Sequence, residues 1–200
     1  MNFTRCRQNC VPCAVRYRKP GFLHKGNMNL TDIITLSIEQ APAFRDIRLA
    51  ALLQAPQAFG ASHAIESAKP LSFFEERLCT SMVWAARRND NLIGVACLAP
   101  GMSDREKHKG FIWGVFVAPE VRGQGVSRAL LTTLLTWADQ HYEQVTLTVT
   151  ATNSAALALY QQAGFDIFGR EPRALKDETG YSDEILMVRF APQASPAPVA

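Results

Sequence analysis

The segment Arg122–Gly125 has the composition of an anion-binding turn. It follows the apolar run Phe111–Val117 and leads into an apolar-periodic segment that begins at Ser127. Glycine permits left-handed backbone conformations and lets a ligand approach the main chain closely. Successive amides before a helix can then converge on one point, where the helix dipole adds partial positive charge. The order therefore predicts a phosphate or pyrophosphate site, although Gly-x-Gly alone is a weak motif.

A second group of residues, Asn153–Phe165, follows the alternating segment Val145–Thr150. Its small and apolar positions recur at helical spacing, and Gly164 is placed to end a helix before a new strand. Tyr160 lies on the apolar face of this helix. From its spacing alone, Tyr160 is as consistent with core packing as with chemistry.

Together the two segments resemble the GNAT superfamily of acetyl-CoA-dependent N-acetyltransferases. The resemblance is carried by Val117-x-Pro119-x-x-Arg122-Gly123-x-Gly125 and, downstream, by Asn153-x-x-Ala156-x-x-Leu159-Tyr160-x-x-x-Gly164-Phe165. The order of elements matches from about residue 33 to 190, and the specific motifs lie within 117–165. Ser127 departs from the Gly or Ala usual at its place in the family loop, but a hydroxyl in a first helical turn can cap the helix or donate to phosphate.

The resemblance implies acetyl-CoA as co-substrate and no metal ion. Acetyl-CoA would lie where strands 111–117 and 145–150 splay apart, with its pantetheine amides paired to the backbone of the first strand. Its pyrophosphate would lie on the amides of residues 123–127. The Asn153 side chain would cap its helix or bond the pantetheine arm. The expected acetyl-CoA contacts are Phe116, Val117, Arg122, Gly123, Gln124, Gly125, Val126, Ser127, Asn153 and Tyr160.

The resemblance also implies a catalytic role for Tyr160. When an amine attacks the thioester, the departing thiolate needs a proton or a hydrogen-bond donor, and a nearby phenol can supply either. A general base is less evident, because an amine with a pKa near about 10 must first lose a proton and strand 111–117 contains no carboxylate. The candidates elsewhere are Glu66, Glu184, Asp183, His63 and His108.

Contacts to the acceptor are expected from the loop after the first helix, from the central strand and from the polar segment 170–181. We expect that segment to reach over Trp113, which is equally consistent with simple core burial. Acidic and basic groups near one cleft would suit an acceptor that bears both an amine and a carboxylate, such as an amino acid. The candidate substrate residues are Phe59, Glu66, Trp113, Arg173 and Tyr181.

Length and composition favour one domain with flanking extensions. The chain has 200 residues, of which 48% are hydrophobic, and no apolar run is long enough to span a bilayer. Residues 1–28 hold six basic and no acidic residues, which leaves 15 basic against 18 acidic residues in the rest. We expect a basic, unpacked extension over 1–28, an N-acetyltransferase domain over 29–191 and a disordered Pro/Ala-rich tail over 192–200.

Three of the five cysteines, Cys6, Cys10 and Cys13, lie in the basic extension. Their C-x3-C-x2-C spacing is that of radical S-adenosylmethionine enzymes, which hold a [4Fe–4S] cluster, but the pattern of a large barrel does not follow. A zinc site that recruits His24 is a further alternative. We favour an unstructured extension without metal. The two remaining cysteines lie in apolar surroundings, which is typical of core thiols in the reducing cytoplasm.

Periodicity predicts an α+β fold with a mixed, mostly antiparallel β-sheet flanked by helices, in the order β-α-α-β-β-β-α-β-α-β-β. The segment Asn89–Asn91 is expected to form a hairpin turn. Helices are expected from Pro42 to before Pro56 and over 71–78, 127–137 and 154–163. Strands are expected over 33–38, 82–87, 92–98, 111–117, 145–150, 165–170 and 184–190.

We therefore expect a cytoplasmic N-acetyltransferase that acts on a primary amine of a small molecule or amino acid. It would act as a monomer or homodimer, with neither nucleic acid nor a membrane as partner. Three alternatives stay open: acetylation of a protein N-terminus or lysine, a non-catalytic acyl-CoA-binding domain, and nucleic-acid binding through the basic extension. Fold class alone cannot choose the acceptor.

Overall fold

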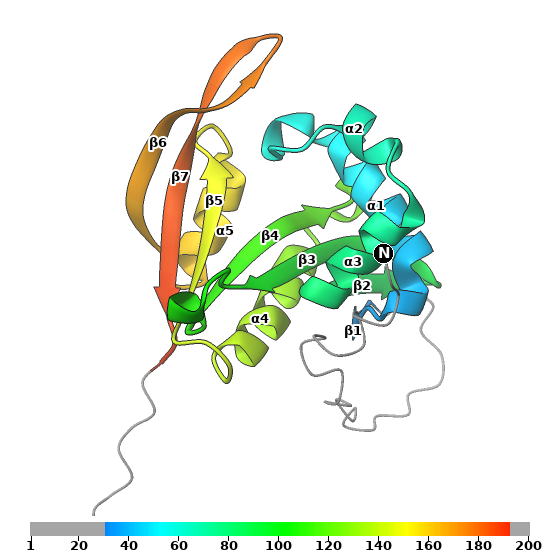
Figure 1. Ribbon diagram of the computed structural model, residues 1–200, viewed down its shortest axis with the longest axis horizontal. Coiled ribbons are helices and arrows are strands. Elements are labelled where there is room, and N and C mark those ends of the chain that lie inside the picture. The colour runs from blue at the N-terminus through cyan, green and yellow to red at the C-terminus, as the bar shows by residue number, and fades with distance from the viewer. Residues whose placement is uncertain (1–30, 193–200) are drawn as a thin grey trace, which may run out of the picture.

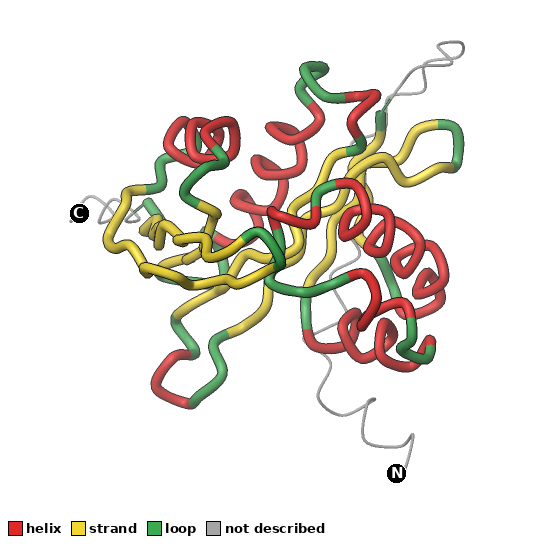
Figure 2. The backbone as a smooth tube through the Cα atoms, turned by 90° about the horizontal axis from the view of Figure 1, so that it is seen from above, coloured by secondary structure: helices red, strands yellow, loops and turns green. Residues whose placement is uncertain are grey.

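The computed structural model describes residues 31–192, which form a seven-stranded sheet with helices on both faces (Figures 1 and 2). The strand order is β1-β2-β3-β4-β5-β7-β6, and only β4 and β5 run parallel to each other. This confirms the predicted fold class. The basic extension with its cysteine motif, and residues 193–200 of the tail, lie outside the described residues.

The elements follow the predicted order with one short helix added. The α-helices are α1 (Ala41–Gln54), α2 (His63–Ser67), α3 (Leu71–Thr80), α4 (Val126–Ala138) and α5 (Ser154–Gln162). The strands are β1 (Asp32–Thr35), β2 (Met82–Arg88), β3 (Asn91–Pro100), β4 (Lys109–Val117), β5 (Gln144–Thr150), β6 (Asp166–Asp177) and β7 (Gly180–Phe190). Across residues 31–192, none of these helices combines the length and hydropathy that a membrane span requires.

The core consists of two layers, one on each face of the sheet. Alternation along β2 sends Val83 and Ala85 to one face, where they pack with Phe44 of α1 and Phe74 of α3. The intervening residues Trp84 and Ala86 pack on the other face with apolar residues of α4 and α5. Successive side chains of a strand point to opposite faces, so a strand that is buried on both sides lacks the polar alternation of a surface strand.

The hairpin between β2 and β3 forms as predicted. Arg88 pairs with Asn91, and the two residues between them, Asn89 and Asp90, adopt left-handed φ values of 49° and 63°. Asn and Asp tolerate this region better than other non-glycine residues do. The turn therefore closes the hairpin with two residues.

The largest difference from the prediction concerns residues 170–181. They do not form a separate polar cover, but continue β6 and β7 into a long hairpin that extends beyond the rest of the sheet (Figure 1). A bulge between Glu171 and Leu175 interrupts the ladder, and Arg173 adopts a left-handed φ of 55° within it. The bulge and Pro172 break the alternation from which a strand is read in sequence, so the strand was predicted to end too early.

Candidate active site

The parallel strands β4 and β5 separate within the sheet. They pair only through Lys109–Phe111 of β4 and Gln144–Thr146 of β5. Beyond these residues β4 continues along β3, and β5 continues along β7. Each strand therefore turns an unpaired edge toward an open gap at its carboxyl end, which is where ligands bind in sheets with parallel strands.

A bulge at Gly114 accompanies this separation. Cys97 of β3 pairs with Trp113, but Val95 pairs with Phe116, so β4 contains one residue more than β3 over this stretch. Gly114 has a φ of 63°, a conformation that favours glycine. A Cβ there would lie 3.3 Å from the Cys97 sulfur. The bulge bends β4 away from β5 and increases its local twist.

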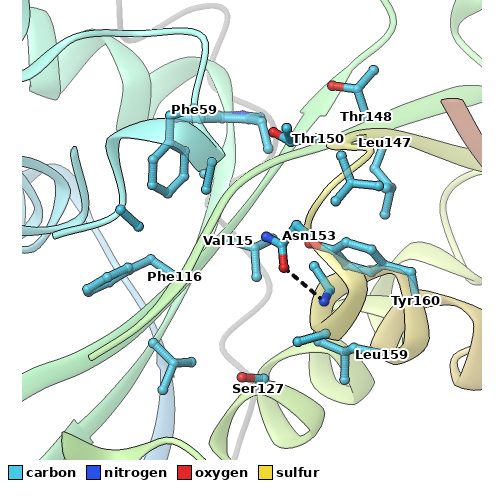
Figure 3. A pocket seen from close by; sticks show the side chains of 18 of the residues that line it. Phe59, Val115, Phe116, Ser127, Leu147, Thr148, Thr150, Asn153, Leu159 and Tyr160 are labelled. Atoms are coloured by element: carbon cyan, nitrogen blue, oxygen red, sulfur yellow. Dashed lines mark hydrogen bonds between the residues drawn. The ribbon is translucent and has the colours of Figure 1, made fainter. Parts of the chain in front are cut away.

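A cavity of about 460 Å³ fills the gap between the two strands (Figure 3). Of the predicted acetyl-CoA contacts, six residues line it: Phe116, Val117, Arg122, Ser127, Asn153 and Tyr160. Gly123, Gln124, Gly125 and Val126 lie in the adjoining turn and are not part of the lining. Of the predicted substrate contacts, Phe59 and Trp113 line the cavity, whereas Glu66, Arg173 and Tyr181 do not.

The turn before α4 has the geometry of an anion cradle. Gly123 and Gly125 adopt left-handed φ values of 76° and 81°, and a Cβ on either would meet no atom within 4 Å. The backbone amides on either side of this segment form hydrogen bonds: that of Arg122 donates to the Pro119 carbonyl, and that of Ala129 donates to the Gly125 carbonyl. The backbone amides of the intervening residues 123–128 donate to no described residue. The open start of a helix with free amides attracts anions.

Side chains of the turn hold it in place. Arg122 Nε donates to the carbonyl oxygen of Val117 at 3.0 Å, which ties the turn to the end of β4. The side-chain amide of Gln124 accepts from Arg88 through its oxygen at 3.1 Å and donates through its nitrogen to the Glu120 carbonyl at 3.3 Å. Gly125 is the N-cap of α4, so Ser127 does not cap the helix and its side chain lines the cavity instead. Arg122 thus anchors the turn.

Helix α5 carries the second motif to the opposite wall of the gap. The Asn153 side chain accepts from the amide of Ala156 at 3.2 Å and caps the helix (Figure 3). At the other end, Gly164 adopts a φ of 87° and ends α5 as predicted. Phe165 then packs edge-on against Tyr160, with ring centroids 5.9 Å apart. These contacts fix the ring of Tyr160 at the cavity.

The Tyr160 hydroxyl is a neutral donor directed at the cavity. Burial raises the pKa of Tyr160 to about 12, because the phenolate is poorly solvated there. No described residue accepts a hydrogen bond from this hydroxyl. The group therefore stays protonated at neutral pH and is available to a bound ligand.

The end of the cavity opposite the α4 turn is roofed by the segment that follows α1. This roof comprises the 3₁₀ turn η2 (Pro56–Ala58) with Phe59 and Gly60. Figure 3 shows Phe59 and Thr150 on one side of the cavity and Ser127 on the other. The Thr150 hydroxyl of β5 donates to the Gln57 carbonyl at 2.9 Å. A Cβ on Gly60 would lie 3.3 Å from Leu175 of β6, so the roof also touches the hairpin.

Behind the roof lies a buried ion pair that the sequence did not reveal. Arg48 of α1 donates twice to the Glu66 carboxylate of α2, through Nε and Nη2, each at 2.9 Å. Both side chains are more than nine-tenths buried. The guanidinium also lies 5.1 Å from the ring centroid of Phe59 and 5.8 Å from that of Trp113. Glu66 therefore holds Arg48 against two aromatic walls, rather than lining the cavity.

The predicted substrate residues of the hairpin contact each other. The Arg173 guanidinium lies 5.2 Å from the ring centroid of Tyr181, and the Arg173 amide donates to Asp183 at 2.8 Å. Tyr181 is exposed. Both residues belong to the β6–β7 hairpin and lie outside the cavity lining. The prediction ended the strand too early and therefore placed them in a segment over the cavity.

Most of the candidate bases are engaged or distant. Glu66 is bonded to Arg48, and Asp183 to Arg170 at 2.6 Å. His108 precedes β4, at the end of the strand where β4 and β5 are still paired. His63 begins α2 and does not line the cavity. Within residues 31–192, no group of three or more His, Cys, Asp or Glu side chains is placed to hold a metal ion.

Comparison with known proteins identifies the arrangement. The family model described as Acetyltransferase (GNAT) family matches residues 47–165, which is more than half of the chain. N-acetyltransferase 8 of Homo sapiens is 33% identical over 101 residues, which make up 50% of this chain and 44% of that protein. The chain thus matches less than half the length of this curated relative.

Two solved structures share the fold. A GNAT-family acetyltransferase from Streptococcus pneumoniae superposes with a TM-score of 0.73 at 20% identity, covering 82% of this chain and 100% of that one. An acetyltransferase from Salmonella typhimurium, solved with its cofactor acetyl-CoA, has a TM-score of 0.69 at 20% identity. That match covers 85% of this chain and 99% of the other.

Proposed function

Because the chain belongs to the acetyltransferase (GNAT) family, we propose that it transfers the acetyl group of acetyl-CoA to a primary amine of a small molecule or amino acid. The observation that carries the proposal is the cavity between β4 and β5. One end of it adjoins an anion cradle, and the other is walled by the aromatic side chains of Phe59 and Trp113. Similarity to a human N-acetyltransferase supports transfer to nitrogen.

The residues present fit acetyl-CoA. The free amides of residues 123–128 suit a pyrophosphate, and the open space at Gly123 and Gly125 leaves room for it. The unpaired edge of β4 suits the extended amides of a pantetheine arm, which would add to the sheet as a short strand does. One acceptor on this edge, the Val117 carbonyl, already takes a bond from Arg122 and keeps a second lone pair. Acetyl-CoA supplies the activated thioester.

The side chains around the gap would have different roles in the acetyl transfer. Tyr160 would donate from its neutral phenol to the leaving sulfur, since its raised pKa keeps it protonated. Asn153 already caps α5 through its oxygen, which leaves its amide nitrogen for a ligand carbonyl. Phe59 and Trp113 would exclude water around the acceptor nitrogen.

The roof favours a small acceptor over a protein chain. It bridges α1 to β5 through the bond between Thr150 and Gln57, and it touches Leu175 of β6. A folded protein that presented its N-terminus or a lysine would have to displace these contacts. A small amine has only to fit beneath them.

A screen that follows thiol release from acetyl-CoA tests the proposal. The panel should contain free amino acids, polyamines and other small primary amines, together with peptides that present an N-terminus or a lysine. We expect saturable thiol release with at least one small amine. Release with peptides alone would favour the protein-acetylation alternative, and saturable binding of acetyl-CoA without any release would favour a non-catalytic acyl-CoA-binding domain.

Gly125→Glu should weaken acetyl-CoA binding by well over tenfold, which is more than about 1.4 kcal/mol. The side chain would enter the open space of the cradle and place a carboxylate beside the pyrophosphate. Isothermal titration calorimetry measures the effect. Gly125→Ala separates backbone strain from charge and should lose less affinity. Thr132→Glu adds the same charge at an exposed position of α4 and should bind normally. Unchanged affinity in folded Gly125→Glu protein would place the pyrophosphate elsewhere.

The compartment and assembly stay predictions. We keep the cytoplasm as the expected compartment and a monomer or homodimer as the expected state, with neither nucleic acid nor a membrane as partner. Size-exclusion chromatography with light scattering checks the assembly.

A further inference from the structure

We propose that Glu184 of β7 is the general base of the acetyl transfer, and that its carboxylate takes the proton from the acceptor ammonium. The inference rests on the proposed function and adds a residue to it. Strand β4 contains no carboxylate that could act within the gap, and the other candidates are bonded or lie away from the cavity.

Glu184 lies beside the acceptor end of the cavity. It is paired directly with Thr150 of β5, and directly paired side chains lie on the same face of a sheet, about 5 Å apart. Thr148, two residues earlier, shares that face, and its hydroxyl acts to lower the pKa of the Glu184 carboxyl. Both threonines line the cavity, and Thr150 also bonds the roof. Glu184 itself is not a lining residue. It lies one strand away, beside the two threonines that line the cavity and at the edge of the roof.

Glu184 carries a charge that no described basic residue neutralises. It forms no ion pair within residues 31–192, and neither does Glu171, which lies directly opposite it on β6. The neighbouring carboxylate, Asp183, is paired with Arg170. An ammonium group at the acceptor end would supply the missing counter-charge. The same carboxylate can therefore attract the protonated amine and accept its proton.

The surroundings of Glu184 raise its affinity for a proton. Burial raises the pKa of Glu184 above its usual value of 4.5, the Thr148 hydroxyl opposes this shift, and repulsion from the Glu171 carboxylate adds to it. A base whose pKa is closer to neutrality accepts a proton more readily while still being ionised. The groups that face Glu184 are the Glu171 carboxylate of β6 and the threonine hydroxyls of β5. The roof, residues 56–60, has no titratable side chain.

Deprotonation of the acceptor ammonium begins the transfer. An N–H bond of the ammonium breaks and an O–H bond forms on Glu184. The freed lone pair forms the C–N bond to the acetyl carbon, and the C–S bond breaks. Of the two protons that the nitrogen loses, the first passes from Glu184 to solvent and the second ends on the thiol of coenzyme A.

The test measures kcat/KM against pH for Glu184→Gln, using the amine of the panel that wild-type protein turns over fastest. We expect a loss of about 10²-fold at neutral pH, with acetyl-CoA binding retained. The loss should shrink as the pH approaches the pKa of the amine, because the substrate then arrives deprotonated. A purely structural role would not be relieved by alkali. Glu178→Gln removes the same charge from the exposed turn of the hairpin and should behave as wild type.

Two further variants keep the proposal testable if Glu184→Gln folds poorly. Glu171→Gln removes the repulsion and should shift the acidic limb of the wild-type profile to lower pH. Thr148→Val removes the hydroxyl that lowers the pKa of Glu184 and should shift the limb to higher pH. Wild-type kinetics in folded Glu184→Gln protein, or an acidic limb that neither variant moves, would overturn the proposal for Glu184. Absence of acetyl transfer by the wild-type protein would instead overturn the proposed function.

Discussion

Replacement of Tyr160 by phenylalanine should lower kcat by about 10²-fold, the usual scale for loss of a general acid, while acetyl-CoA still binds. The substitution keeps the ring, its burial and its edge-on contact with Phe165. It removes only the neutral donor that would stabilise the leaving thiolate. The proposed contacts to pantetheine and pyrophosphate come from β4 and the α4 turn, so they are unaffected.

Turnover at saturating amine measures the effect of Tyr160→Phe, and calorimetry measures binding. The free energy of unfolding should fall by no more than about 1 kcal/mol, since one hydroxyl is lost. Tyr142→Phe is the matched control, because burial also raises the pKa of Tyr142 although that residue does not line the cavity. Wild-type turnover of Tyr160→Phe would leave Tyr160 as a packing residue.

Glu66→Ala should cost about 3–5 kcal/mol of the free energy of unfolding, because it leaves the buried Arg48 guanidinium without its counter-charge. The loss would act on the acceptor end of the site as well. Arg48 is held between the rings of Phe59 and Trp113 by its two bonds to Glu66. We therefore expect KM for the amine to rise in whatever fraction of Glu66→Ala protein stays folded.

Urea denaturation of two further variants separates burial from charge. Asp104→Ala breaks an exposed pair with Lys107 and should change stability by less than about 0.5 kcal/mol. The double variant Arg48→Met with Glu66→Leu removes both buried charges and keeps apolar volume, so it should be more stable than Glu66→Ala. Equal stability of Glu66→Ala and Asp104→Ala would show that the buried pair contributes no more than a surface pair.

The fold class and the acetyl-CoA half of the site were predictable because their signals are local. The turn at residues 122–125, the start of α4, the cap at Asn153 and the stop at Gly164 all depend on neighbours within one or two turns of chain. These features lie within residues 117–165, so the connections between them are short. The structure confirms the elements, and the catalytic and binding roles of their residues stay predictions.

The acceptor half depends on residues that are far apart in the chain. Glu66 was predicted to contact substrate, and only the packing of α2 against α1 brings it to Arg48. The roof contact between Thr150 and Gln57 joins residues 93 positions apart. The candidate base Glu184 reaches the site through the register of β7 with β5.

The sequence by itself therefore determined the order of elements and the anion-binding turn, where backbone conformation follows from glycine, capping residues and periodicity. Tertiary structure decided which charged groups face the acceptor. The sequence alone does not distinguish a charged side chain that is solvated from one that is ion-paired or catalytic. The difference depends on which partner the fold places within a few ångströms of it. Arg48 neutralises Glu66, Arg170 neutralises Asp183, and the described basic residues leave Glu184 unpaired beside the cavity.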